Sequence, residues 1–253
     1  MLSEVTAKNS PIEPCIHGSE TEFAATASRP DNTIVDMGTL LEHNQKLSRV
    51  TFGKDSWLNQ GAPFSAWWSL TPSGGRLYPD MSHLEVATPE TFGIYDLVLQ
   101  ELVAEKIALM ALNGYACSGD IISFQLNKRS GDQLGHFFGA HENISNKKRT
   151  FDRPMLANGI PLSIRALAVA HHLTRTLYTG EGGFGLEDEK LQYMLSPRVR
   201  YSVSDFSTRL NHPLVGSSDD LIHAKRRQVV GAANVSPWAI AVKHGMNGVL
   251  LNS

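Results

Sequence analysis

The chain has 253 residues, enough for one large domain or two small ones with a sizeable core. Apolar residues make up 42% and charged residues 19%, which excludes intrinsic disorder of the whole chain. Lys and Arg total 23 against 25 Asp and Glu, so no basic excess indicates nucleic acid or an anionic membrane as a partner, and no apolar run is long enough for a membrane span.

Residues 1–16 are polar, contain Pro11 and Pro14, and predict a flexible N-terminal arm. We expect residues 17–253 to form the folded domain. The first residues lack the layout of a secretory signal, and the two cysteines, Cys15 and Cys117, fit reduced thiols at least as well as one disulfide. We therefore expect a soluble, cytoplasmic protein.

Regular alternation begins at residue 17, where Glu20 and Glu22 would face the same side of a strand. Two carboxylates on one strand face repel each other unless a cation lies between them. The sequence leaves two interpretations: a solvated edge strand, or part of a cation site.

Residues 34–70 are typical of loop and short strand, and residues 73–80 predict a turn that leads into a short strand. Arg76, Tyr78 and Asp80 would share one face of that strand. An arginine directly after two glycines is a plausible phosphate clamp, because its guanidinium can bind two oxygens at once. The alternative for Arg76 and Asp80 is a surface ion pair.

From Thr91 onward, apolar residues recur at helical spacing as far as Gly114, with Thr88 or Thr91 as the N-cap and Gly114 at the C-terminal end. Further helices are expected at 154–179 and 237–251, and a loop at 179–185. Further strands are expected at 120–126, 137–144, 201–206 and 228–232. Helices and strands without regular βαβ alternation predict the α+β class.

Ligands for a hard metal ion concentrate on the predicted strands and their ends: Glu20, Glu22, Glu85, His141 and Glu142. Carboxylate-rich sites of this kind suit Mg²⁺, which prefers oxygen ligands, phosphate and water. An acid held beside such a site, as Asp80 would be, can act as a general base or as a nucleophile.

Six blocks of sequence carry a more specific signal. Residues 74–90 read Gly-Gly-Arg-Leu-Tyr-Pro-Asp-Met-Ser-His-Leu-Glu-Val-Ala-Thr-Pro-Glu, and the others are residues 19–23, 135–143, 173–182, 195–198 and 230–236. In this order they resemble the Pup–protein ligase and Pup deamidase (depupylase) family, of the glutamine-synthetase-like carboxylate–amine ligase superfamily. The resemblance implies a curved, mostly antiparallel sheet flanked by helices.

The resemblance also implies roles for single residues, with ATP and Mg²⁺ as cofactors. Asp80 matches the catalytic aspartate, and Arg76 and Thr88 match contacts to the nucleotide phosphates. Glu20, Tyr78 and Glu85 match positions of the magnesium site. Additional candidates for the site are Glu22, His141, Glu142 and Arg175.

Ligases of this family phosphorylate the C-terminal glutamate of the small protein modifier Pup, and a lysine of a target protein then displaces the phosphate. Deamidases of the family hydrolyse an amide at the same position. By resemblance the chain is therefore an ATP- and Mg²⁺-dependent ligase or amide hydrolase in the pupylation and proteasome pathway, with a Pup-like protein and a target lysine as partners.

The chain departs from the family in ways that keep other interpretations open. The resemblance covers about the N-terminal half of family members, without their C-terminal domain. The spacing from Asp80 to Glu85 matches deamidases, while Glu20-Thr21-Glu22-Phe23 matches ligases. Near Ser218 an arginine of the family is missing. The alternatives are a non-catalytic relative that binds nucleotide or a Pup-like partner, an oligomer or half of a split enzyme completed by a second chain, and a ligase for a different carboxylate.

Overall fold

The structure is a computed structural model. It describes residues 16–35, 57–58, 68–80, 83–117, 119, 121–131, 138–147, 162–187, 190–197, 204–207, 213–219, 224–231 and 233–252. The N-terminal arm predicted for residues 1–16 lies outside the described residues, apart from Ile16.

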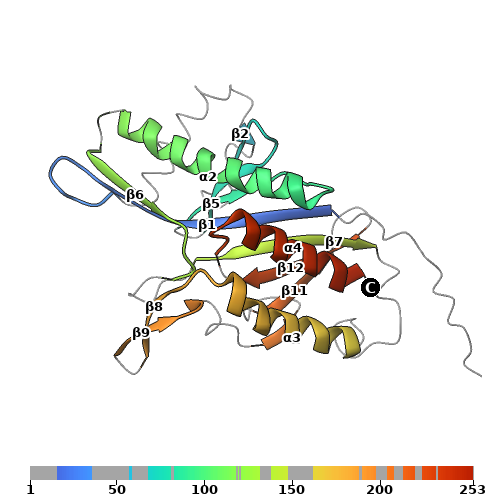
Figure 1. Cartoon of the computed structure of the whole chain (residues 1–253). Helices are drawn as coiled ribbons and strands as arrows, with labels where there is room; N and C mark the ends of the chain where they lie inside the picture. The colour runs from blue at the N-terminus through green and yellow to red at the C-terminus, as the bar shows by residue number, and fades with distance from the viewer. Residues whose placement is uncertain are drawn as a thin grey trace, which may run out of the picture.

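One large sheet organises the described part of the chain (Figure 1). Its strands run in the order β10-β11-β12-β7-β1-β5-β4-β3-β2, and β6 also pairs with β1. The pairings between the described strands of this sheet are antiparallel except that of β10 with β11. A mostly antiparallel sheet with helices confirms the predicted α+β class.

The strands have the following bounds: β1 Ile16–Ser28, β2 Trp57–Leu58, β3 Trp68–Leu70, β4 Arg76–Asp80, β5 His83–Ala87, β6 Ser123–Asn127, β7 Ala140–Lys147, β10 Ser204–Ser207, β11 Pro213–Asp219 and β12 Ala224–Gly231. A separate hairpin is formed by β8 Gly183–Glu187 and β9 Lys190–Met194. The turn between β3 and β4 places Gly74 at φ +89°, a conformation that side chains with a Cβ rarely adopt.

Strand β1 lies inside the sheet and not at its edge. Its first half pairs with β7 on one side and β5 on the other, and its second half pairs with β6. The edge-strand interpretation of Glu20 and Glu22 is therefore wrong. Their carboxylates stand on an interior strand, where neighbours on both sides can approach them.

Three helices of the described chain cover one face of the sheet: α2 Ile94–Cys117, α3 Leu162–Thr179 and α4 Pro237–Asn252 (Figure 1). Helix α4 packs against both α2 and α3, while α2 contacts β1 and β5 and α4 contacts β7. None of the helices in the described ranges is long and apolar enough to cross a lipid bilayer.

The hydrophobic core lies between α2 and the sheet. Helix α2 buries Ala104, Ala108 and Leu112, whose spacing of four places them on one helical face. Their partners Phe23 and Leu84 stand opposite each other on β1 and β5. Because side chains alternate along a strand, burying this side of the sheet leaves Glu22 and Glu85 on the other side.

Several element predictions differ from the structure at their ends. Helix α2 continues past Gly114, so this glycine is not its C-terminal cap. Helix α3 is described from Leu162, and the earlier part of the expected helix, residues 154–161, lies outside the described residues. The loop expected at 179–185 is wrong from Gly183 onward, where β8 begins. Strand β11 was not expected.

Candidate functional site

Strand register gathers the polar side chains of four strands on the sheet face away from α2. Glu22 stands opposite Glu85, and Glu85 stands opposite Tyr78 on its other side. Residues directly opposite in an antiparallel pair share a face, as do residues two apart on one strand. By this rule the face, called the acidic face below, holds Glu20, Glu22, Arg76, Tyr78, Asp80, His83, Glu85 and His141.

Two groups of possible metal ligands form on the acidic face. Glu20, Glu85 and His141 make one group, and Glu22, Asp80 and Glu85 make the other. Within each group the ligand atoms lie within 4.8 Å of one another. Glu85 belongs to both groups, so one carboxylate connects two adjacent positions where a cation would fit.

Histidines hold two of these carboxylates. His141 Nδ1 lies 3.1 Å from Glu20 Oε2, between β7 and β1. His83 Nδ1 lies 2.6 Å from Glu22 Oε2, between β5 and β1. Both contacts join residues of different strands, so the ligand positions depend on the register of the sheet.

The crowding of carboxylates shifts their protonation. Burial, with a further contribution from the neighbouring Glu20 carboxylate, raises the pKa of Glu85 to about 8. Burial and the charges of Glu20 and Glu85 also raise the pKa of Tyr78, which is therefore a neutral phenol. The repulsion between the carboxylates is reduced either by a proton on Glu85 or by a bound divalent cation. A cation that binds there would therefore replace the proton of Glu85.

The other groups of the face titrate according to their neighbours. Burial opposes ionisation of Glu22, but hydrogen bonds from His83 and from the Gly139 backbone outweigh it and hold its pKa below the usual value. Burial likewise opposes protonation of His141, but the Glu20 carboxylate raises its pKa. Burial and the charge of Glu22 raise the pKa of Asp80, which makes it a stronger base.

Gly139, just before β7, gives the ligands their space. A Cβ atom at this position would lie 2.6 Å from Glu22 Oε1 and 2.6 Å from His141 Nε2. Such distances are far shorter than van der Waals contact, so any side chain here would displace both groups.

The donor set of the acidic face fits Mg²⁺ or Mn²⁺. It offers carboxylates, a phenol and one imidazole, and hard divalent cations prefer oxygen-rich sites with positions left for water and phosphate. Glu85, 3% exposed, would remain ionised at neutral pH only with such a positive charge beside it.

The two residues expected to contact phosphate lie at the margin of this face. Arg76 is exposed at the start of β4 and shares its side with Tyr78 and Asp80. Thr88 follows β5, and its Oγ1 accepts a hydrogen bond of 3.0 Å from the backbone N–H of Ser19. Their proposed roles toward a nucleotide remain predictions.

The structure places two of the additional candidates, Glu142 and Arg175, apart from the acidic face. Glu142 is the next residue after His141 and points to the helix side, where the Arg175 guanidinium lies 2.8 Å from its Oε1. Asn247 of α4 also donates a hydrogen bond to this carboxylate. Glu142 and Arg175 are 1% and 3% exposed, so they form a buried ion pair behind β7.

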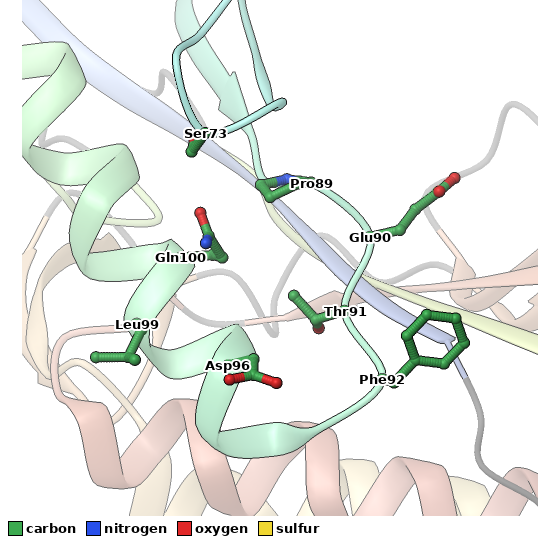
Figure 2. A pocket seen from close by; sticks show the side chains of 8 residues that line it. All are labelled: Ser73, Pro89, Glu90, Thr91, Phe92, Asp96, Leu99 and Gln100. Carbon is green, nitrogen blue, oxygen red and sulfur yellow. The ribbon is translucent and has the colours of Figure 1, made fainter.

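A pocket elsewhere shares no residue with the acidic face. Figure 2 shows it between the connection from β5 to α2 and the first turns of α2, lined by Ser73, Pro89, Glu90, Thr91, Phe92, Asp96, Leu99 and Gln100. Within the described ranges, both groups of possible metal ligands lie on the acidic face and neither lies in this pocket.

From the sequence alone, no role was assigned to His83 or Gly139, although both lie in the sequence blocks that carry the family resemblance, residues 74–90 and 135–143. His83 could have been identified by its spacing, because it lies two residues before Glu85 on the same strand and so shares its face. Gly139 could not, because the Glu22 and His141 side chains come close to it only after β1 and β7 have paired.

The protein is thus of the α+β class. Its mostly antiparallel sheet has helices on one face and a candidate divalent-metal site on the other. The chain belongs to the Pup-ligase protein family, whose model matches residues 15–253. This confirms the resemblance seen in the sequence blocks.

Curated relatives include both kinds of enzyme in this family. The Pup–protein ligase of Kocuria rhizophila is 28% identical over 93% of this chain and 51% of its own length. The depupylase of Acidothermus cellulolyticus is 29% identical over 72% of this chain and 36% of its own length. The chain thus spans about half the length of the curated relatives that it matches.

Two solved structures share the fold. The chain is similar to the ligase in a crystal structure of the complex between Pup and its ligase PafA, with a TM-score of 0.69, 22% identity, and coverage of 94% of this chain and 46% of that one. It is also similar to PafA in complex with ADP, with a TM-score of 0.56, 24% identity, and coverage of 82% and 45%.

Proposed function

We propose that the protein is an ATP- and Mg²⁺-dependent enzyme of the Pup ligase/depupylase type, which joins or hydrolyses an amide at the C-terminal glutamate or glutamine of a Pup-like protein. The observation that carries this proposal is the pair of ligand groups that share Glu85. Two adjacent cation positions on one face suit a reaction that moves a phosphoryl group.

Metal ions bound there would neutralise the charge of the nucleotide phosphates. Glu20, Glu85 and Tyr78 would hold one side of the site, with Glu22 and His141 beside them. Arg76 would contact the phosphates, because its guanidinium stands exposed on the same face, and Thr88 would do so from the end of β5.

Asp80 would act on the second substrate. An ammonium group must lose a proton before it can attack a carbonyl or phosphorylated carboxylate. Asp80, which matches the catalytic aspartate of the family, has a raised pKa that suits it to accept one, whereas Glu85, whose pKa is also raised, would bind the metal ions. In the hydrolytic direction the same carboxylate would activate or position water, or attack the amide directly.

The nucleotide and the protein substrate are inferred from relatives. One related structure contains ADP and another contains Pup, and the curated relatives are named for ligation to Pup or for its removal. A lysine of a target protein would supply the amine in ligation. We place the reaction in the cytoplasm, because the exposed free thiol of Cys117 fits a reducing compartment.

A second candidate function is binding without turnover. The part of the family seen here matches 51% of the length of the Kocuria ligase and carries the candidate cation positions, which alone would support binding of a nucleotide or a Pup-like partner. A second chain that completes the enzyme would reconcile both functions.

The proposal is tested by incubating the chain with ATP, Mg²⁺ and a Pup-like protein ending in glutamate or glutamine, and recording intact masses. Addition of the modifier to a lysine-bearing protein supports ligation, and a mass gain of about 1 Da on the glutamine form, the difference between an amide and an acid, supports deamidation. Nucleotide binding without either change would favour the second candidate.

A further inference from the structure

His83 makes a closer contact with a carboxylate of the acidic face than His141 does. Its Nδ1 lies 2.6 Å from Glu22 Oε2, and in the two-stranded register of β4 and β5 it stands directly opposite Asp80. His83 is not a member of either group of possible metal ligands, yet it touches a member of one.

The direction of this hydrogen bond follows from the state of Glu22. A carboxyl group binds a divalent cation in its ionised form, so Glu22 as a ligand beside Asp80 and Glu85 is a carboxylate. An ionised carboxylate can only accept hydrogen bonds. Nδ1 of His83 therefore carries the proton and donates it toward Oε2.

Two further contacts keep both side chains in place. The His83 ring packs on Phe138 with centroids 4.6 Å apart, which fixes the ring plane. On the other side of Glu22, a hydrogen bond from the Gly139 backbone also reaches the carboxylate. Glu22 thus accepts hydrogen bonds from a side-chain donor and a backbone donor. Together they orient its carboxylate beside Asp80 and Glu85.

We propose that His83 is a positioning residue of the metal site, which orients Glu22 as a ligand through its Nδ1–H. Outer hydrogen bonds of this kind fix the orientation of ligating groups, and their loss weakens metal binding about 10- to 100-fold. The inference rests on the proposed function, because it requires that a divalent cation binds to Glu22, Asp80 and Glu85.

The test uses Mn²⁺ alone as the probe, titrated into the metal-free full chain and followed by the electron paramagnetic resonance signal of free Mn²⁺. Two neutral variants separate the two ring nitrogens. In His83→Asn the amide nitrogen takes the place of Nδ1, and in His83→Gln it takes the place of Nε2. Circular dichroism of each variant verifies that it is folded.

We expect His83→Asn to bind Mn²⁺ within about threefold of the original chain and His83→Gln to bind about 10-fold or more weakly. In a Glu22→Met background the two variants should bind alike, because methionine has no oxygen to accept the hydrogen bond. If His83→Gln does not fold, His83→Leu replaces it, since leucine fills the space beside Phe138 without offering a donor.

Equal affinities of His83→Asn and His83→Gln in the chain with Glu22 would overturn the inference, whether both match the original or both are weakened. If the original chain bound no Mn²⁺, the proposed metal site itself would fail and the inference with it. The two failures are therefore distinguishable in a single experiment.

Discussion

Glu20 and His141, 121 residues apart in the chain, stand directly opposite each other on β1 and β7, with His141 Nδ1 3.1 Å from Glu20 Oε2. This pairing joins the opening strand of the domain to the strand that follows α2 and β6. On the other side of β1, Glu22 stands opposite Glu85 of β5. The register of three strands therefore decides whether a metal site exists at all.

The protonation of Glu85 predicts a stability change in Glu85→Gln. The folded pKa of about 8 lies above the ordinary value of 4.5, so the native state holds its proton more tightly than the unfolded state. The stability from this group is complete below pH 4.5 and is lost as the pH rises through 8. Glutamine, which resembles the protonated form, should make the metal-free protein more stable at pH 8, by up to about 4 kcal/mol.

Urea unfolding at pH 4.5 and pH 8 measures this difference. The advantage of Glu85→Gln should shrink toward zero at the lower pH, and Mg²⁺ should reverse it at pH 8, because only the carboxylate binds the cation. A difference that did not change with pH would mean that Glu85 is not crowded by other charges in the folded protein.

Gly139→Ala should weaken metal binding, because its Cβ would meet both Glu22 Oε1 and His141 Nε2 at 2.6 Å. We expect a loss of Mn²⁺ affinity of about 10-fold or more, comparable to the loss of an orienting contact. Gly245→Ala in α4 is the matched control, since a Cβ there meets nothing within 4 Å.

The control should bind Mn²⁺ as well as the original chain and gain about 0.5–1 kcal/mol of stability, because alanine favours helix over glycine. Calorimetric titration with Mn²⁺ and thermal melting of both variants provide the two measurements. Unchanged Mn²⁺ affinity in Gly139→Ala would contradict the close approach of Glu22 and His141 to this position.

Arg175→Met should destabilise the fold without acting on the metal site directly. It leaves the Glu142 carboxylate, 1% exposed, without its cation, and removing one partner of a buried pair costs roughly 3–5 kcal/mol. Arg29→Met, whose exposed partner is Thr33, is the control and should change stability by less than about 0.5 kcal/mol. Equal midpoints of urea unfolding for the two variants would contradict the buried ion pair.

Asp80→Asn should abolish turnover while it leaves the affinity for MgATP within a few-fold, if Asp80 accepts the proton of the attacking group. Asparagine keeps the size and loses the basicity of the side chain. Asp80 also belongs to one ligand group, with Glu22 and Glu85. A large loss of MgATP affinity would therefore assign it to metal binding, and retained turnover would exclude it as the base.

The sequence allowed some of this site to be predicted, because period-two alternation is local. Glu20 and Glu22 on one face, and Arg76, Tyr78 and Asp80 on one face, both follow from spacing alone, and the register confirms both sets. The same rule would have separated Glu142 from its neighbour His141. Glu142 was instead grouped with the metal ligands by residue type, and the structure places it behind the sheet.

Other parts depend on contacts between distant segments. Strand β1 is an interior strand because it pairs with β7, which is more than 110 residues away in the chain. From the sequence alone, two acidic residues in an alternating strand fit an edge strand equally well. The strand at Gly183–Glu187 was hidden because its glycines favour loops, and its pairing with β9 overrides that preference. Gly114 stays helical because α2 continues to Cys117 and its Ala116 packs against the core.

The measurement that tests the account most directly is calorimetric titration of the chain with ATP, with and without Mg²⁺, beside the variant Glu20→Ala. The account predicts micromolar binding that requires Mg²⁺ and is lost in Glu20→Ala, because the acidic face repels the phosphates unless a cation lies between them. Binding that is equal without Mg²⁺, or unchanged in Glu20→Ala, would contradict the assignment of the acidic face as the metal–nucleotide site.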